Sequence, residues 1–173
     1  MEGESGIIYS MKEFGIKREN EERRDGGCAV IFNPQNGLFA VYRNEKNGIL
    51  GLYGGGFDEG EDEKDGVLRE VKEESGLYDF SYIEKVEQVI THYFNTNKNV
   101  NRVAMATCFL FILNSEKREE TKLEAHENFS FIWARAEEIL SSWEDNNKDK
   151  NYEHWVYFFK NSLGRLGELG YLK

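Results

Sequence analysis

Residues 55–77 read GGFDEGEDEKDGVLREVKEESGL, and no other stretch of the chain says as much about its fold. The segment from Asp62 to Ser75 lacks proline and is rich in good helix formers, so it predicts a helix. Acidic residues crowd its start, where the helix dipole favours negative charge, and Gly76 stands where a helix stop is expected. Gly66 costs about 1 kcal/mol relative to alanine inside a helix, which indicates close backbone packing at that position.

One face of this predicted helix carries three carboxylates. Glu70, Glu73 and Glu74 stand at positions i, i+3 and i+4, so they point the same way and repel one another. A solvated acidic face is the ordinary alternative for such a pattern. The preceding glycines, Gly54–Gly56, favour a different reading, because glycine lets a backbone carbonyl approach the carboxylates closely. Carbonyl and carboxylate oxygens suit Mg²⁺ or Mn²⁺, so the pattern predicts a divalent metal site, in which Arg69 can orient a carboxylate.

The same stretch resembles a complete Nudix box, the signature of the Nudix hydrolase family, and all nine of the specified positions match. The resemblance implies an α/β fold, namely an α/β/α sandwich with a mixed sheet and the Nudix-box loop and helix. It also implies cleavage of a nucleoside diphosphate linked to another group, with Mg²⁺ or Mn²⁺ as cofactor. The implied metal ligands are Gly55, Glu70, Glu73 and Glu74.

The resemblance also implies roles for residues around the metal. Glu70 is either a metal ligand or the general base, and Arg69 holds it in place. Glu61 assists an outer metal or braces the loop. Outside the box, relatives often use a late carboxylate as an extra ligand or base, and Glu127 is our candidate, with Glu124 as an alternative. An ordinary solvated charge is an equal explanation for Glu127.

Two residues are candidates for binding the substrate. Arg43 ends a predicted strand near the expected substrate entrance and could contact a phosphate, although a surface arginine is the equal alternative. Tyr53 stands where the family often has proline before the paired glycines, a departure that concerns the loop or the substrate pocket. His92, Tyr93 and Phe94 could stack on a base, but aromatic residues in a strand are more often part of the core.

The composition narrows the class of protein. The chain has 173 residues and a formal net charge of −10, which opposes non-specific binding to nucleic acid. Cys28 and Cys108 lie in apolar runs and are expected to be reduced core residues. No apolar run approaches 18 residues, and no signal-peptide pattern starts the chain. We therefore expect a cytoplasmic protein, without a membrane partner, that is a monomer or a homodimer.

Residues 1–25 are predicted to be a polar, mobile lead-in with a strand at Ile7–Tyr9, and residues 26–173 to form the domain. Alternating and apolar runs predict the remaining elements. The predicted strands are 28–32, 38–42, 49–53, 78–94 (one strand or a pair), 103–113 and 129–134, and the later helices are 137–143 and 152–166. Trp143 and Trp155 are expected to pack, and His126 and His154 to lie on the surface.

These features together predict a metal-dependent pyrophosphohydrolase. The expected substrate is a nucleotide sugar, ADP-ribose, a dinucleoside polyphosphate or a nucleoside triphosphate. A catalytically silent nucleotide-binding module of the same fold is the main alternative, but a pure binder need not keep three mutually repelling acids. A hydrolase of capped or triphosphorylated RNA is a third possibility, which would need a local basic patch at Lys17, Arg18, Arg23 and Arg24.

Overall fold

The computed structural model describes residues 11–173. The predicted strand at Ile7–Tyr9 lies outside these residues. The elements, in chain order, are β1 (Glu13–Gly15), β2 (Glu22–Arg23), β3 (Gly26–Asn33), β4 (Leu38–Asn44), β5 (Leu50–Gly51), β6 (Tyr53–Gly56), α2 (Glu63–Ser75), β7 (Phe80–Asn95), β8 (Val100–Leu113), β9 (Phe129–Ala134), α3 (Ala136–Glu144), the short 3₁₀ helix η1 (Lys148–Lys150) and α4 (Glu153–Glu168).

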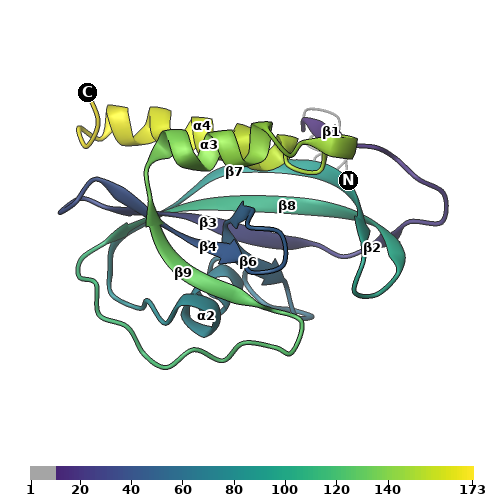
Figure 1. Ribbon diagram of the computed structural model, residues 1–173, viewed down its shortest axis with the longest axis horizontal. Helices are drawn as coiled ribbons and strands as arrows, with labels where there is room; N and C mark the ends of the chain where they lie inside the picture. Colours follow the sequence, from purple (N-terminus) through teal and green to yellow (C-terminus); the bar gives the residue numbers. More distant parts are fainter. Residues whose placement is uncertain (1–10) are drawn as a thin grey trace.

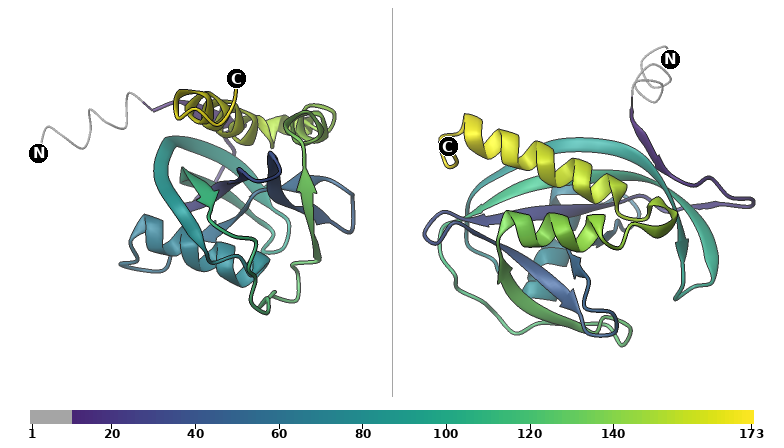
Figure 2. Two further views of the ribbon diagram at one scale, coloured as in Figure 1. Left: turned by 90° about the vertical axis from the view of Figure 1, so that its left-hand side faces the viewer. Right: turned by 45° about the horizontal axis from the view of Figure 1, so that its top comes forward.

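The strands form one mixed sheet that lies between two helical layers, with α3 and α4 on one face and α2 on the other (Figures 1 and 2). The strand order is β1-β7-β8-β3-β4-β5, with β2 paired to β8, β6 to β3 and β9 to β4. β3 runs parallel to β8, while β7 and β8 form a long antiparallel pair. The predicted α/β/α sandwich with a mixed sheet is therefore confirmed.

The central strand β3 is buried on both faces, which explains its uninterrupted apolar sequence. Val30 and Phe32 pack in the core under α3 and α4, whereas Ala29 and Ile31 pack in the second core, toward α2. Successive side chains of a strand point to opposite faces, so one apolar run supplies both cores. The sheet thereby holds α2 and its acidic face in a fixed position.

Helix α2 begins and ends where its sequence indicates. The Asp62 carboxylate accepts a hydrogen bond from the Asp65 N–H at 3.2 Å and caps the helix start. Gly76 ends the helix with φ = +80°, a conformation that only glycine adopts easily. Gly66 packs tightly, because a methyl group there would lie 2.7 Å from the Phe57 ring. The close backbone packing that we expected at Gly66 is thus confirmed.

The lead-in is the main departure from the predicted organisation. We expected a mobile segment up to residue 25, but β1 pairs in parallel with β7 and β2 pairs in parallel with β8. The buried His92 ring fastens this segment, with Nδ1 2.7 Å from a Glu21 carboxylate oxygen and Nε2 bonded to Glu13. The expectation of a mobile segment was therefore wrong for residues 11–25. The strands there are polar and are held by an ion pair, so their sequence shows no apolar periodicity from which they could be predicted.

Several smaller expectations are settled by the described residues. The stretch predicted as one strand or a pair at 78–94 is one long strand, β7, which runs from Phe80 to Asn95. Cys28 and Cys108 are free and buried side by side on β3 and β8, as expected. Trp143 is fully buried. None of the helices found in residues 11–173 combines the length and the apolar character that a membrane crossing requires.

Candidate active site

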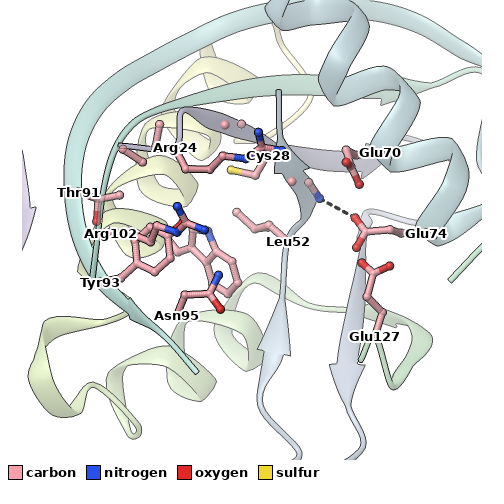
Figure 3. Close-up of a pocket in the computed structure, with 18 of the residues that line it drawn as sticks. Arg24, Cys28, Leu52, Glu70, Glu74, Thr91, Tyr93, Asn95, Arg102 and Glu127 are labelled. Atoms are coloured by element: carbon pink, nitrogen blue, oxygen red, sulfur yellow. Dashed lines mark hydrogen bonds between the residues drawn. The ribbon is translucent and has the colours of Figure 1, made fainter. Parts of the chain in front are cut away.

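A cavity of about 740 Å³ opens between the glycine-containing strand β6, helix α2, the hairpin of β7 and β8, and the start of α4. This volume is within the range of small-molecule sites. Its two sides differ in charge (Figure 3). Glu70, Glu74 and Glu127 lie on one side, and Arg24 and Arg102 lie on the other.

The acidic side is crowded and poorly solvated. Glu74 is only 5% exposed, and its Oε1 accepts a hydrogen bond from the Gly54 N–H at 2.9 Å. Burial raises the pKa of Glu74 to about 10, and the hydrogen bond and charge of Glu127 add to this rise. Burial likewise raises the pKa of Glu70 to about 7, although Arg69 opposes the shift. These carboxyl groups repel one another when charged, so a cation between them would be strongly favoured.

Arg69 connects the carboxylates of the helix to the loop before it. Its Nε and Nη2 donate to the two oxygens of Glu61 at 2.8 and 3.0 Å, and its Nη1 donates to Glu70 at 3.1 Å and to Glu73 at 3.4 Å. The hydrogen bonds from Arg69 lower the pKa of Glu61 to about 2. Glu61 also accepts a hydrogen bond from the Asp58 N–H at 3.0 Å, so it braces the loop.

The glycine strand β6 passes directly over the acidic side. A methyl group on Gly55 would lie 2.6 Å from the carboxyl carbon of Glu70, well inside contact distance. Only glycine at this position leaves Glu70 free to lie against the backbone. The strand is held there by antiparallel pairing with β3, in which Gly55 is opposite Gly27 and Gly54 is opposite Cys28.

The family comparison agrees with this geometry. The model of the NUDIX domain family matches residues 22–157, which is most of the chain. The chain belongs to the Nudix family. A curated relative, Nudix hydrolase 25 of Arabidopsis thaliana, is 28% identical over 156 residues, which are 82% of this chain and 87% of that protein. The chain is accordingly a Nudix hydrolase, an enzyme that acts on phosphoric anhydride bonds.

Solved structures show the same Nudix fold. The MutT protein of Methanosarcina mazei Go1 is 22% identical with a TM-score of 0.60, covering 86% of this chain and 98% of its own. The NUDIX domain of Shewanella oneidensis NrtR, solved with ADP-ribose, is 16% identical with a TM-score of 0.60, covering 94% of this chain and 98% of its own. At these identities the likeness concerns the fold alone.

Of the residues that we proposed from outside the Nudix box, some line the cavity and others lie away from it. Glu127 and Glu124 both line the cavity, and Glu127 faces Glu74 (Figure 3). Arg43 is exposed on β4 and does not line the cavity. Tyr53 is buried, with its hydroxyl donating to the Val41 carbonyl at 3.3 Å, and packs in the core on the α2 side.

Residues on the basic side were missed or placed differently by the sequence analysis. Tyr93 lines the cavity, whereas neighbouring His92 is buried in the attachment of β1. His154 lines the cavity and is half-buried, so the expectation of a surface histidine was wrong. Most cavity-lining residues of the hairpin alternate along its strands, so a period of two in the sequence was the available signal. The alternating residues are Thr91, Tyr93 and Asn95 on β7, and Arg102, Ala104 and Ala106 on β8; Phe94 and Thr107 also line the cavity and depart from the alternation.

Proposed function

We propose that this Nudix hydrolase cleaves the diphosphate linkage of a small nucleotide and that it requires Mg²⁺ or Mn²⁺. The observation that carries the proposal is the crowding of Glu70, Glu74 and Glu127 beside the glycine strand, with the pKa values of two of them raised. Such a group of acids is unfavourable by itself and becomes favourable when a divalent cation neutralises it. ADP-ribose in the NrtR structure supports a nucleotide diphosphate as ligand.

The side chains present fit a hard divalent cation. Glu70, Glu73, Glu74 and the Gly55 carbonyl would hold the metal, because all four offer oxygen, which Mg²⁺ and Mn²⁺ prefer. Within residues 11–173, no three His, Cys, Asp or Glu side chains are gathered closely enough to hold an ion without adjustment. The Glu73 side chain is 38% exposed and its ion pair with Arg69 is long, at 3.4 Å, so a change of rotamer toward a bound cation would cost little. When bound, the metal would neutralise charge that builds on the phosphate oxygens.

The protein's own residues would supply proton transfer and orientation. Glu70 or Glu127 would accept a proton from the attacking water. Arg69 would keep Glu70 in position through the 3.1 Å hydrogen bond and hold Glu73 near it. The products would be a nucleoside monophosphate and a second phosphorylated molecule.

A panel of substrates tests the proposal. ADP-ribose, a nucleotide sugar, a dinucleoside tetraphosphate and nucleoside triphosphates would be incubated with the protein and Mg²⁺ or Mn²⁺, with a coupled phosphatase and product analysis by mass spectrometry. We expect turnover of at least one compound, abolished by EDTA and restored by added metal. Calorimetric binding of a nucleotide that is never cleaved would instead show a binding module.

Glu74→Gln tests the role of the buried carboxylate. The amide keeps the shape of the side chain but cannot ionise to hold a cation, so kcat should fall at least about a hundredfold, which is roughly 3 kcal/mol of transition-state stabilisation. The thermal midpoint should stay close to that of the wild type, because the buried Glu74 carboxyl already favours its neutral form. Glu137→Gln, at an exposed position on α3, is the matched control. Turnover of Glu74→Gln within about threefold of wild type would contradict the assignment.

A further inference from the structure

The side of the cavity opposite the acids is formed by Arg24, Tyr93 and Arg102, which we call the arginine wall. In Figure 3 these side chains gather on one side of the cavity, and Leu52 and Cys28 separate them from Glu70, Glu74 and Glu127. Tyr93 and Arg102 are opposite each other in the register of β7 and β8. The cavity of an acidic protein with a net charge of −10 therefore contains a separate, basic compartment.

Arg102 has hydrogen-bonding capacity that the protein does not use. Its side chain is only 14% exposed, and its buried Nε has no partner among the described residues. A buried guanidinium N–H without an acceptor is costly unless a ligand supplies one. Its Nη1 donates to Glu22 at 3.0 Å, but the Glu22 side chain is 61% exposed, and such exposed pairs contribute little.

Arg24 also lacks a charge partner among the residues that the structure describes. In residues 11–173, no hydrogen bond or ion pair is found for its guanidinium, which lies over the backbone of Gly56. A methyl group on Gly56 would lie 2.6 Å from Nε of Arg24. The adjacent acid, Asp25, is engaged elsewhere, because it accepts from Arg23 at 2.9 Å and from the Met105 N–H at 2.9 Å.

Tyr93 lies within reach of both charges. Burial raises its pKa, and the nearby guanidiniums of Arg102 and Arg24 oppose that rise. The phenol remains protonated at neutral pH and can donate a hydrogen bond. Nε of Arg102 and the guanidinium of Arg24 are donors without an acceptor among residues 11–173, and phosphate oxygens are acceptors that arginine binds well.

We propose that the arginine wall binds a phosphate of the substrate that lies outside the linkage that is cut. The inference rests on the proposed function, in which the acids and their metal hold the cleaved diphosphate. ADP-ribose and nucleotide sugars have only the two phosphates of that linkage, so they would leave the wall without a partner. The substrate class is therefore a nucleotide with a longer phosphate chain, such as a dinucleoside polyphosphate or a nucleoside triphosphate.

Binding of inorganic tripolyphosphate in metal-free buffer tests the wall without any catalysis. By calorimetry, Arg24→Gln and Arg102→Gln should each weaken binding roughly tenfold to a hundredfold, because each removes a charge-assisted hydrogen bond. Arg135→Gln, which removes an equal charge from an exposed site at the start of α3, should bind as the wild type does. Glu22→Gln should bind as tightly or more tightly, since it releases Nη1 of Arg102. Failure of wild type to bind at millimolar concentration, or unchanged binding by both arginine variants, overturns the proposal.

Kinetics separate this inference from the proposed function. Arg24→Gln and Arg102→Gln should raise KM for a dinucleoside tetraphosphate about tenfold or more, with kcat and thermal midpoint preserved, and change KM for ADP-ribose by less than about threefold. Equal effects on the two substrates would overturn the inference even though hydrolysis is intact. If wild type hydrolysed neither substrate, the proposed function would fail, while the tripolyphosphate titration would still decide whether the wall binds phosphate.

Discussion

Three consecutive glycines, Gly54, Gly55 and Gly56, should respond differently to the same substitution. Each is changed to alanine, which adds one methyl group. None of the three has a positive φ, so alanine fits the backbone conformation and only the space around the new methyl matters. The atoms that this methyl would meet belong to a strand, to a proposed active-site residue and to a flexible arginine, respectively.

At Gly54 the methyl would lie 2.2 Å from the Gly27 carbonyl oxygen and 2.7 Å from the Cys28 Cα. Both atoms are backbone of β3, so relief requires the paired strands to separate. Overpacking of this kind costs about 1–3 kcal/mol or more, and about 3 kcal/mol lowers the thermal midpoint of a chain of this size by roughly 6–12 °C. We therefore expect a loss of stability at Gly54.

At Gly55 the methyl would lie 2.6 Å from the carboxyl carbon of Glu70 and 2.7 Å from its Oε1. Relief requires the Glu70 carboxylate to move by up to about 1 Å, because ordinary contacts lie near 3.5 Å. Displacement on that scale typically costs about a hundredfold in rate. The Glu70 side chain is near the surface of the cavity, so the thermal midpoint should change little.

At Gly56 the three atoms nearest the methyl all belong to the guanidinium of Arg24, with Nε at 2.6 Å. That side chain can rotate away, so both the fold and kcat should be retained, and Gly56→Ala serves as the matched control. Thermal unfolding and kcat on one cleaved nucleotide, at saturating concentration so that displacement of Arg24 does not enter through KM, would be measured for all three variants. The reasoning is refuted if Gly55→Ala keeps wild-type activity, or if Gly54→Ala melts at the same temperature as Gly56→Ala.

Two further predictions concern stability. Burial lowers the pKa of His92, but its hydrogen bonds to Glu13 and Glu21 outweigh that effect and leave it raised, so the protonated ring stabilises the fold. This contribution is complete below the unfolded pKa of about 6.5 and is lost as pH rises through the folded pKa. The thermal midpoint of wild type should exceed that of His92→Gln at low pH, and the difference should shrink as pH rises above about 6.5. A difference that stays constant with pH would contradict this role of His92. Trp143→Phe should cost about 2–4 kcal/mol in urea unfolding, because it removes the 2.8 Å hydrogen bond from Nε1 to the buried Leu50 carbonyl and leaves a void; a loss below about 1 kcal/mol would contradict this.

The acidic half of the site was predictable because its residues are close in sequence. The spacing of Glu70, Glu73 and Glu74 on one helix follows from helical geometry alone, and Gly76 and Asp62 mark the ends of that helix. Glu127 was harder to choose, because Glu124 stands in the same loop and both line the cavity. The loop that carries them has no periodicity that could tell them apart.

The basic half depends on contacts between distant segments. Arg24 and Arg102 are brought to one wall by the parallel pairing of β2 with β8, and Tyr93 by the register of β7 with β8. No local pattern encodes that pairing, because β2 has two residues, both exposed and charged. The same reason explains why the attachment of residues 11–25 was missed.

The amino-acid order alone indicated the family through a local motif and the acidic helix through short-range periodicity, and the resemblance to the family then implied a mixed sheet between helices. Only the tertiary structure showed which residues face the acids across the cavity. Arg24 and Arg102 line the cavity, whereas Arg43 does not. The physical reason is that strand pairing and register are set by the total burial of the sheet, to which every segment contributes, and not by any one segment.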